Sequence, residues 1–166
     1  MKAIVVETQT AQRELCWQDV PEPLAGDSEV LLDVHATAVN RADLLQRAGQ
    51  YPPPPGESTI LGLEMAGVVT ATGAQVTDWQ VGDRACALLG GGGYAECVAV
   101  DARQLLPIPE GWSFERAAAV PEVFLTAWLN LFREGELRIG ETVLIHAGAS
   151  GVGTAAVQLA REAGCR

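Results

Sequence analysis

The residues best suited to chemistry form a glycine-rich turn between a short apolar run and a helical segment. Residues 143–145 are apolar, residues 146–153 contain three glycines, and residues 154–161 have the composition of a helix. A strand, a glycine turn and a helix N-terminus in this order let the backbone approach a pyrophosphate, and the free N–H groups of the helix face its charge. The pattern therefore predicts a nucleotide-binding turn that follows a buried strand.

The composition limits the possible partners. The chain has 166 residues and a net charge of −10 from 11 basic and 21 acidic residues. This length suits one complete domain. The basic residues are scattered, and a phosphate backbone needs clustered ones, so no nucleic acid partner is expected.

Cysteines and apolar runs point to a soluble cytoplasmic protein. None of the four cysteines belongs to a CxxC pair, and their surroundings are mostly apolar, which is typical of reduced, buried thiols. The apolar run at residues 3–6 is too short for a signal peptide. No window approaches the roughly 18 apolar residues of a membrane span, so no membrane contact is expected.

The first two thirds of the chain has a β pattern, and the last third has a helical one. Asn40 can cap a helix over residues 42–47, and Ser113 can cap a helix over residues 114–119. After Pro121 an amphipathic helix is expected over residues 122–134. Together these patterns place a domain boundary near residue 121. The expected strands cover residues 2–6, 15–19, 29–36, 62–72, 84–89 and 94–100.

Six sequence blocks occur together in an order that matches a known family. The chain resembles the zinc-independent quinone oxidoreductase branch of the medium-chain dehydrogenase/reductase superfamily, in particular the p53-inducible quinone oxidoreductase homologues. The matching blocks are Asn40-Arg41-Ala42-Asp43, Gln50-Tyr51 with the prolines after it, Leu61-Gly62-Leu63-Glu64, Val81-Gly82-Asp83, residues 117–127 and residues 146–156.

The resemblance implies a mixed α/β fold in two parts. Residues 1–121 would form a GroES-like, β-rich catalytic domain, and residues 122–166 would begin a Rossmann domain with its first βα unit. Family members are roughly twice this length, so the chain would correspond to the N-terminal half. The resemblance further implies NADPH as cofactor, a small-molecule quinone as substrate and a homo-oligomer for the full-length family.

The same resemblance argues against a bound metal. Zinc enzymes of this superfamily carry a cysteine and a histidine where this chain has Asn40 and Leu63. Leucine supplies no donor atom for tetrahedral zinc, so we expect that the chain has no metal-binding site. Without a Lewis acid, an acceptor such as a quinone is favoured because delocalisation spreads the developing oxyanion charge.

Three residues are candidates for catalysis by resemblance. Asn40 would lie in the nicotinamide pocket, and the alternative is an ordinary helix cap. Tyr51 would lie at the mouth of the active site, where its hydroxyl could donate to the quinone oxygen; the alternative is packing against prolines. Ser150 would contact the cofactor phosphate or the nicotinamide side, and it can equally cap the helix.

Cofactor contacts would come from Asn40 and Ser150, from Thr126 on the linking helix, and from the turn itself. A lone threonine on a helix is more often bonded to its own backbone. The turn residues expected to contact NADPH are Gly148, Gly151, Val152 and Gly153.

Other polar or flexible residues have structural interpretations. His35 and His146 lie in apolar runs and are expected to be core imidazoles with satisfied hydrogen bonds. The glycines at 90–93 could approach a ligand or form a flexible hairpin connection. Two functional alternatives remain: an enone or enoyl reductase of the same superfamily, or a non-catalytic GroES-like module.

Overall fold

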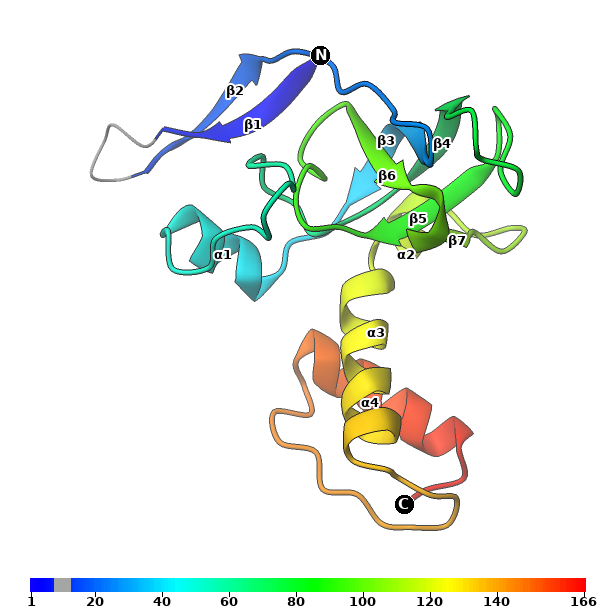
Figure 1. The fold of residues 1–166 in the computed structure, drawn as a ribbon. Helices are drawn as coiled ribbons and strands as arrows, with labels where there is room; N and C mark the ends of the chain where they lie inside the picture. The colour runs from blue at the N-terminus through cyan, green and yellow to red at the C-terminus, as the bar shows by residue number, and fades with distance from the viewer. Residues whose placement is uncertain (8–12) are drawn as a thin grey trace. The chain divides into compact units, whose positions relative to one another are not determined.

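The computed structural model describes residues 1–7 and 13–166. The chain divides into two compact units, Met1–Ala119 (unit 1) and Val120–Arg166 (unit 2), which are drawn in Figure 1. None of the helices within these described ranges combines the length and the apolar composition that a membrane span requires.

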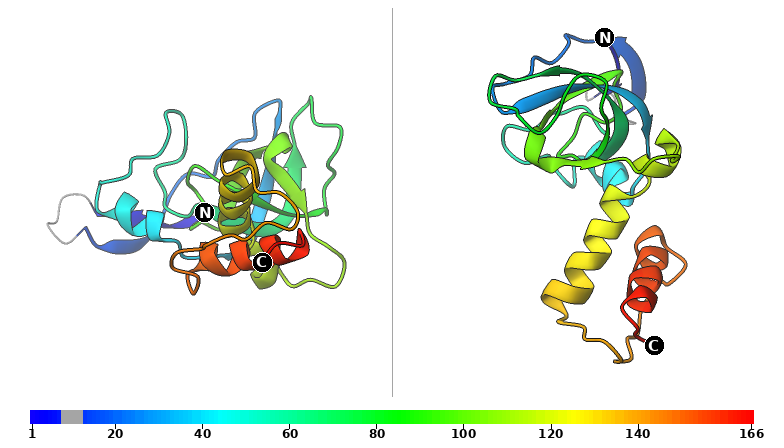
Figure 2. Two further views of the ribbon diagram at one scale, coloured as in Figure 1. Left: turned by 90° about the horizontal axis from the view of Figure 1, so that it is seen from below. Right: turned by 90° about the vertical axis from the view of Figure 1, so that its right-hand side faces the viewer.

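Unit 1 is built from two antiparallel sheets. One sheet pairs β1 (Lys2–Val6) with β2 (Leu15–Asp19). The second has five strands in the order β6-β3-β4-β5-β7, and Figure 2 shows these strands curving around a common centre. Its strands are β3 (Glu29–Thr37), β4 (Glu64–Thr72), β5 (Arg84–Leu88), β6 (Cys97–Asp101) and β7 (Leu105–Pro107).

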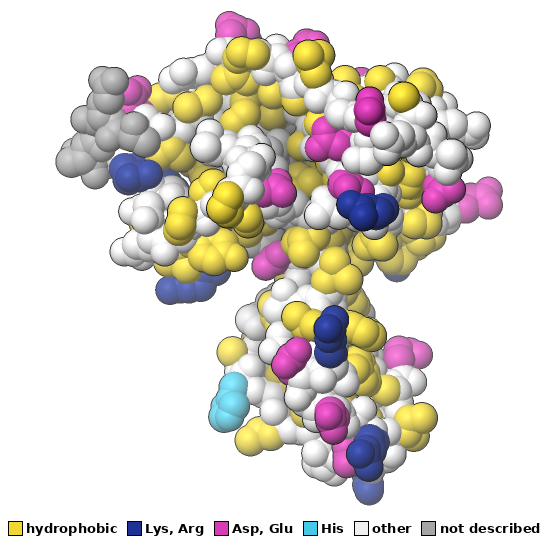
Figure 3. Space-filling model, in the orientation of Figure 1, with side chains coloured by type: hydrophobic (Ala, Val, Ile, Leu, Met, Phe, Trp, Pro, Cys, Tyr) yellow, Lys and Arg dark blue, Asp and Glu magenta, His cyan; other side chains and the backbone are white. Residues whose placement is uncertain are grey.

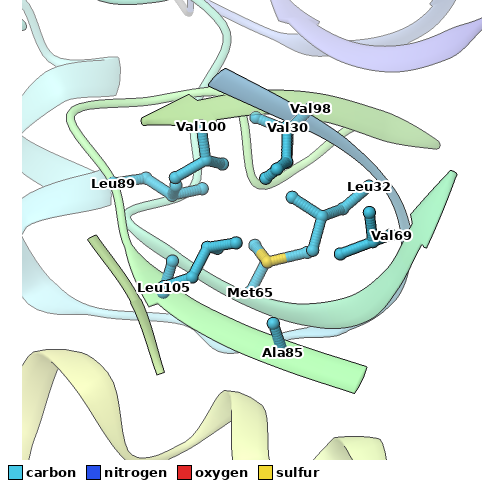
Figure 4. Packing of buried hydrophobic residues seen from close by; sticks show 10 residues of the cluster. Val30, Leu32, Met65, Val69, Ala85, Leu89, Val98, Val100 and Leu105 are labelled. Atoms are coloured by element: carbon cyan, nitrogen blue, oxygen red, sulfur yellow. The ribbon is translucent and has the colours of Figure 1, made fainter. Parts of the chain in front are cut away.

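The core of unit 1 lies inside the curved five-stranded sheet. Alternate residues of β3 face inward, so Val30 and Leu32 are fully buried while Asp33 is exposed. They pack against Met65 and Val69 of β4, as Figure 4 shows. Large apolar side chains from several strands therefore meet in one cluster, which holds the sheet in its curved form.

Two short helices flank the sheet. Helix α1 (Arg41–Arg47) begins after Asn40, and α2 (Phe114–Ala118) begins after Ser113, whose hydroxyl accepts a hydrogen bond from the Arg116 N–H at 3.3 Å. Both predicted caps therefore lie at helix starts, and the predicted helices are confirmed. A short 3-10 helix, η1 (Ala102–Gln104), precedes β7.

Unit 2 contains three helical segments. Helix α3 (Pro121–Trp128) continues into a π-helical segment, η2 (Leu129–Glu134), and α4 (Gly151–Glu162) packs on α3. Small residues allow this close packing, because Ala127 of α3 and Ala155 and Ala156 of α4 are all buried. The face of unit 2 in Figure 3 also shows hydrophobic side chains among charged ones.

The strand predicted at residues 143–145 is wrong. These residues are extended but belong to no sheet, and Leu144 is 80% exposed. A strand requires a hydrogen-bonded neighbour. Here the Val143 N–H instead donates to the Arg166 carbonyl at 2.8 Å, and the Arg166 N–H donates to the Glu141 carbonyl at 2.9 Å.

Glycines of the run at 90–93 pack against neighbouring backbone. Gly91, Gly92 and Gly93 are buried. A Cβ on Gly91 would lie 2.3 Å from the Ser58 carbonyl oxygen, and one on Gly93 would lie 2.8 Å from the Glu64 carbonyl oxygen. The run is glycine-rich because it packs directly against the backbone that leads into β4.

Candidate functional site

Asn40 lies where the chain turns from β3 into α1. Its backbone is extended, with φ −115° and ψ 157°, so it ends the extended segment and α1 begins at the next residue. The Asn40 backbone N–H donates to Asp43 Oδ2 at 2.7 Å. Asp43 stands at the third helical position, so its carboxylate supplies half of a capping box and stabilises the start of α1.

The Asn40 side chain faces a buried carboxylate. Its Nδ2 donates to Glu64 Oε1 at 2.7 Å, and Glu64, the first residue of β4, is 1% exposed. The Thr37 hydroxyl at the end of β3 donates to the Glu64 carbonyl oxygen at 2.7 Å. The end of β3 and the start of β4 are thereby held together around Asn40.

A tyrosine completes this polar cluster. The Tyr94 hydroxyl donates to Asp43 Oδ2 at 2.9 Å. Asp43 is 2% exposed, and its other oxygen, Oδ1, has no hydrogen-bond partner among the described residues. We call Asn40, Asp43, Glu64 and Tyr94 the Asn40 network.

Burial and negative charge set the protonation behaviour around the network. Burial raises the pKa of the Tyr94 hydroxyl well above its ordinary value, and the hydrogen bond to Asp43 raises it further. Burial also raises the pKa of the Cys86 thiol in β5, with a smaller contribution from the charge of Glu64. Both groups therefore remain protonated at neutral pH.

Gly62 brings Tyr94 close to the network. Its φ is +102°, a conformation that favours glycine. A Cβ at this position would lie 2.5 Å from the Tyr94 backbone nitrogen and 2.6 Å from Cδ1 of its ring. Tight packing against Tyr94 therefore requires glycine at this position, two residues before Glu64.

Tyr51 lies outside the network. It sits in the loop after α1 and is 49% exposed. Within the described residues its hydroxyl has no hydrogen-bond partner, so no contact in unit 1 requires the phenol group. A tyrosine hydroxyl that is accessible and unengaged can donate to a ligand, which leaves both of the predicted interpretations open.

The predicted nucleotide turn lies in unit 2 at the start of α4. Ser150 is the N-cap residue, and its hydroxyl accepts a hydrogen bond from the Gly153 N–H at 3.0 Å. The first N–H groups of a helix have no intrahelical acceptor, so those of Gly151 and Val152 remain available for an anion. This half of the predicted strand-turn-helix pattern is formed.

The three glycines of the turn have different surroundings. A Cβ on Gly153 would lie 2.4 Å from the Ala147 carbonyl oxygen, and one on Gly151 would lie 3.0 Å from Val123 Cγ1. A Cβ on Gly148 would meet nothing closer than the Ile145 carbonyl oxygen at 3.9 Å. Packing therefore explains Gly153 and contributes at Gly151, whereas Gly148 borders open space.

Thr126 is half-buried on α3. Its carbonyl oxygen accepts a hydrogen bond from Asn130 Nδ2 at 2.8 Å. That bond involves the backbone, so it gives no evidence on whether the threonine hydroxyl contacts a cofactor.

Two expectations about polar residues need correction. His35 and His146 are both exposed, so neither is a core imidazole. His35 stacks on Phe114 at 4.3 Å between ring centroids, because the strand pattern places it on the outer face of β3. All four cysteines are free, but only Cys86 and Cys97 are buried.

Metal-ligand residues are also dispersed. Leu63 is 6% exposed and contributes to the apolar interior. Across residues 1–7 and 13–166, no three His, Cys, Asp or Glu side chains are grouped so that they could hold a metal ion.

The structure thus brings Asn40 together with three residues that the sequence analysis did not select. Asp43 could have been found, because an acidic residue three positions after a cap residue is a capping-box signal. Glu64 is 24 residues from Asn40, and Tyr94 is 51 residues from Asp43, so no local sequence pattern predicts these contacts.

Comparison with known proteins identifies the family. The model of the alcohol dehydrogenase GroES-like domain matches residues 26–110, which include all five strands of the larger sheet. The chain belongs to this family. Its fold is that of the medium-chain dehydrogenase/reductase superfamily, as the predicted resemblance implied.

Similar proteins include both quinone and enoyl reductases. The quinone oxidoreductase of Thermus thermophilus is 44% identical, with a TM-score of 0.82 over 100% of this chain and 52% of that one. The CurK enoyl reductase is 34% identical, with a TM-score of 0.89 over 99% of this chain and 52% of that one. A phenolphthiocerol synthesis polyketide synthase of Mycobacterium bovis is 49% identical over 88% of this chain and 7% of its own length.

The chain matches only part of each of these relatives. The chain spans about half the length of the solved structures it matches, and under a tenth of the matched polyketide synthase.

Proposed function

We propose that this chain is part of an NADPH-dependent oxidoreductase that reduces a quinone without a metal ion. The observation that carries the proposal is the turn at the start of α4. There, Ser150 caps the helix and Gly148 borders open space. The similar Thermus thermophilus quinone oxidoreductase has been solved in complex with NADPH, which supports the choice of cofactor.

The residues of the turn fit a dinucleotide pyrophosphate. Gly148 offers backbone that an anion can approach, and the N–H groups of Gly151 and Val152 are free of intrahelical bonds. The Ser150 hydroxyl accepts the Gly153 N–H, and its own proton remains able to donate. When bound, NADPH would supply the hydride.

Unit 1 supplies side chains suited to the acceptor. Asn40 is half-buried and carries an amide, and Tyr51 carries an accessible hydroxyl that can donate to a developing oxyanion. Because neither Asn40 nor Leu63 is a zinc ligand, polarisation of the acceptor depends on such hydrogen bonds. A quinone requires little polarisation, because delocalisation spreads the developing charge.

A second candidate is reduction of a conjugated carbon–carbon double bond. The observation that favours it is the similarity to the CurK enoyl reductase and to polyketide synthases. Both candidate reactions deliver hydride to an acceptor conjugated with a carbonyl group, so the same residues suit either.

Comparing the two substrates distinguishes quinone reduction from enoyl reduction. In the protein that carries this chain, NADPH oxidation would be followed at 340 nm with 9,10-phenanthrenequinone and, separately, with an α,β-unsaturated thioester. The proposal predicts the larger kcat/KM for the quinone. A larger value for the thioester would replace it with the enoyl reductase, and no oxidation with either would refute both.

A further inference from the structure

Glu64 is a carboxylate buried at a position where apolar side chains would normally lie. It is 1% exposed, and its neighbours Leu63 and Met65 are buried apolar residues. Burying a carboxylate is costly unless hydrogen bonds compensate. One of these bonds comes from Asn40 Nδ2 at 2.7 Å, a length typical of a charge-assisted hydrogen bond.

This contact fixes which end of the Asn40 amide faces the protein. In the structure the amide nitrogen, and not the amide oxygen, faces Glu64 Oε1. This is the arrangement that a carboxylate requires when it only accepts hydrogen bonds. The nitrogen carries two protons. Among the described residues, only one of them has an acceptor, namely Glu64 Oε1.

Both ends of this contact are held in place. Asp43 accepts from the Asn40 backbone N–H, and the Thr37 hydroxyl donates to the Glu64 carbonyl oxygen. These bonds hold the backbone of both residues, so the Asn40 and Glu64 side chains meet from fixed starting points.

We propose that Glu64 is a positioning residue that makes Asn40 a hydrogen-bond donor toward a ligand carbonyl oxygen. The second Nδ2 proton would donate to this oxygen, which belongs to the nicotinamide carboxamide or to the substrate. The identity of the ligand rests on the proposed function; the orientation of the amide does not.

The orientation can be tested on the chain by NMR. The chain has two asparagines, Asn40 and Asn130, and nine glutamines, so the Asn40 side-chain amide signal is assigned by its loss in Asn40→Asp. We expect widely separated Nδ2 proton shifts for Asn40, with one proton exchanging slowly. Glu64→Gln retains an acceptor oxygen and should preserve this pattern. Glu64→Met removes the acceptor at similar size and should collapse it.

Two outcomes of the NMR experiment would overturn the orientation. One is an Asn40 signal that does not change in Glu64→Met. The other needs no variant to fold: both Asn40 Nδ2 protons of the unaltered chain exchange as fast as those of an asparagine in an unfolded peptide.

Turnover tests the functional part in the protein that carries this chain. Glu64→Met should lower kcat with the quinone about tenfold, the factor expected for losing one charge-assisted hydrogen bond. Glu64→Gln should stay within about twofold, and the double variant Asn40→Ala/Glu64→Met should be no slower than Asn40→Ala alone. Asp101→Asn, which removes a carboxylate at the far end of β6, is the matched charge control.

The pattern of losses separates the possible explanations. A raised KM for NADPH assigns the carbonyl to the cofactor, and a raised KM for the quinone assigns it to the substrate. If the fold losses in kcat of Asn40→Ala and Glu64→Met multiply in the double variant, the positioning role of Glu64 is refuted. An inactive unaltered protein would refute the proposed function, while the NMR result would still decide the orientation of Asn40.

Discussion

Replacing Gly62 with alanine should destabilise unit 1 through two separate effects. The φ of +102° strains any residue with a Cβ, at a cost of about 1 kcal/mol. The added Cβ would also lie 2.5 Å from the Tyr94 nitrogen and 2.7 Å from the Gly93 carbonyl carbon. Both are backbone atoms that cannot rotate away, and such overpacking costs about 2 kcal/mol.

Gly82 is the matched control for the strain. Its φ is +96°, and a Cβ there would meet nothing within 4 Å. Gly82→Ala therefore introduces the strain without the clash. The difference between the two variants isolates the packing of Tyr94 against Gly62.

Thermal unfolding followed by circular dichroism measures this difference. Gly62→Ala should unfold about 8 °C below Gly82→Ala, since 1 kcal/mol corresponds to about 4 °C for a unit of this size. Urea denaturation should give the same order. Equal midpoints in the two variants would show that Tyr94 does not pack against Gly62 as described, and the geometry of the Asn40 network would lose its support.

Three further predictions follow from protonation and burial. Because the pKa of Tyr94 is raised in the folded state, its contribution to stability is present below about pH 10 and is lost as pH rises above it. Tyr94→Phe should therefore show less alkaline loss in urea titrations than the unaltered chain; equal losses would contradict the burial of the Tyr94 hydroxyl and its hydrogen bond to Asp43. Side-chain and backbone hydrogen bonds from Arg103 hold the pKa of Asp101 at about 2. In carbon-detected NMR titrations Arg103→Gln should raise this pKa, and an unchanged value would refute the pairing. With a thiol reagent at neutral pH, two cysteines should react quickly and two only after unfolding, whereas four fast thiols would contradict the burial pattern. The fast pair is Cys16 and Cys165, and the slow pair is Cys86 and Cys97.

Most strands of unit 1 could be predicted because their patterns are local. β3 alternates buried and exposed residues over nine positions, and Pro, Gly and Asp mark the turns around it. β7 was missed because it has only three residues and ends in a proline. Its place in the sheet depends on pairing with β5, which no short window reveals.

The helical end of the chain shows the opposite limit. The apolar run at 143–145 has the composition of a buried strand, yet strand formation depends on a neighbour and not on composition alone. The cap at Ser150 depends only on residues three positions apart, so it was predicted correctly. The expected helix over 122–134 changes to π-helical geometry at Leu129, a change that amphipathic spacing does not encode.

The candidate site divides in the same way. Asn40 was selected by resemblance, and its contact with Asp43 lies within one helical turn. The contacts with Glu64 and Tyr94 arise only when β4 and the connection before β6 fold beside α1. Sequence therefore indicates Asn40 as a candidate, and the long-range hydrogen bonds that orient its side chain become visible only in the structure.

The most direct test of the proposed NADPH site is the affinity of a Gly148→Ala variant for NADPH in the protein that carries this chain. A Cβ at Gly148 would meet no atom closer than 3.9 Å, so the variant should fold and unfold like the unaltered protein. If the turn holds the pyrophosphate, the Cβ blocks the approach of the backbone and the Kd measured by NADPH fluorescence should rise at least about tenfold. An unchanged Kd, with thermal stability also unchanged, would show that NADPH does not bind at this turn.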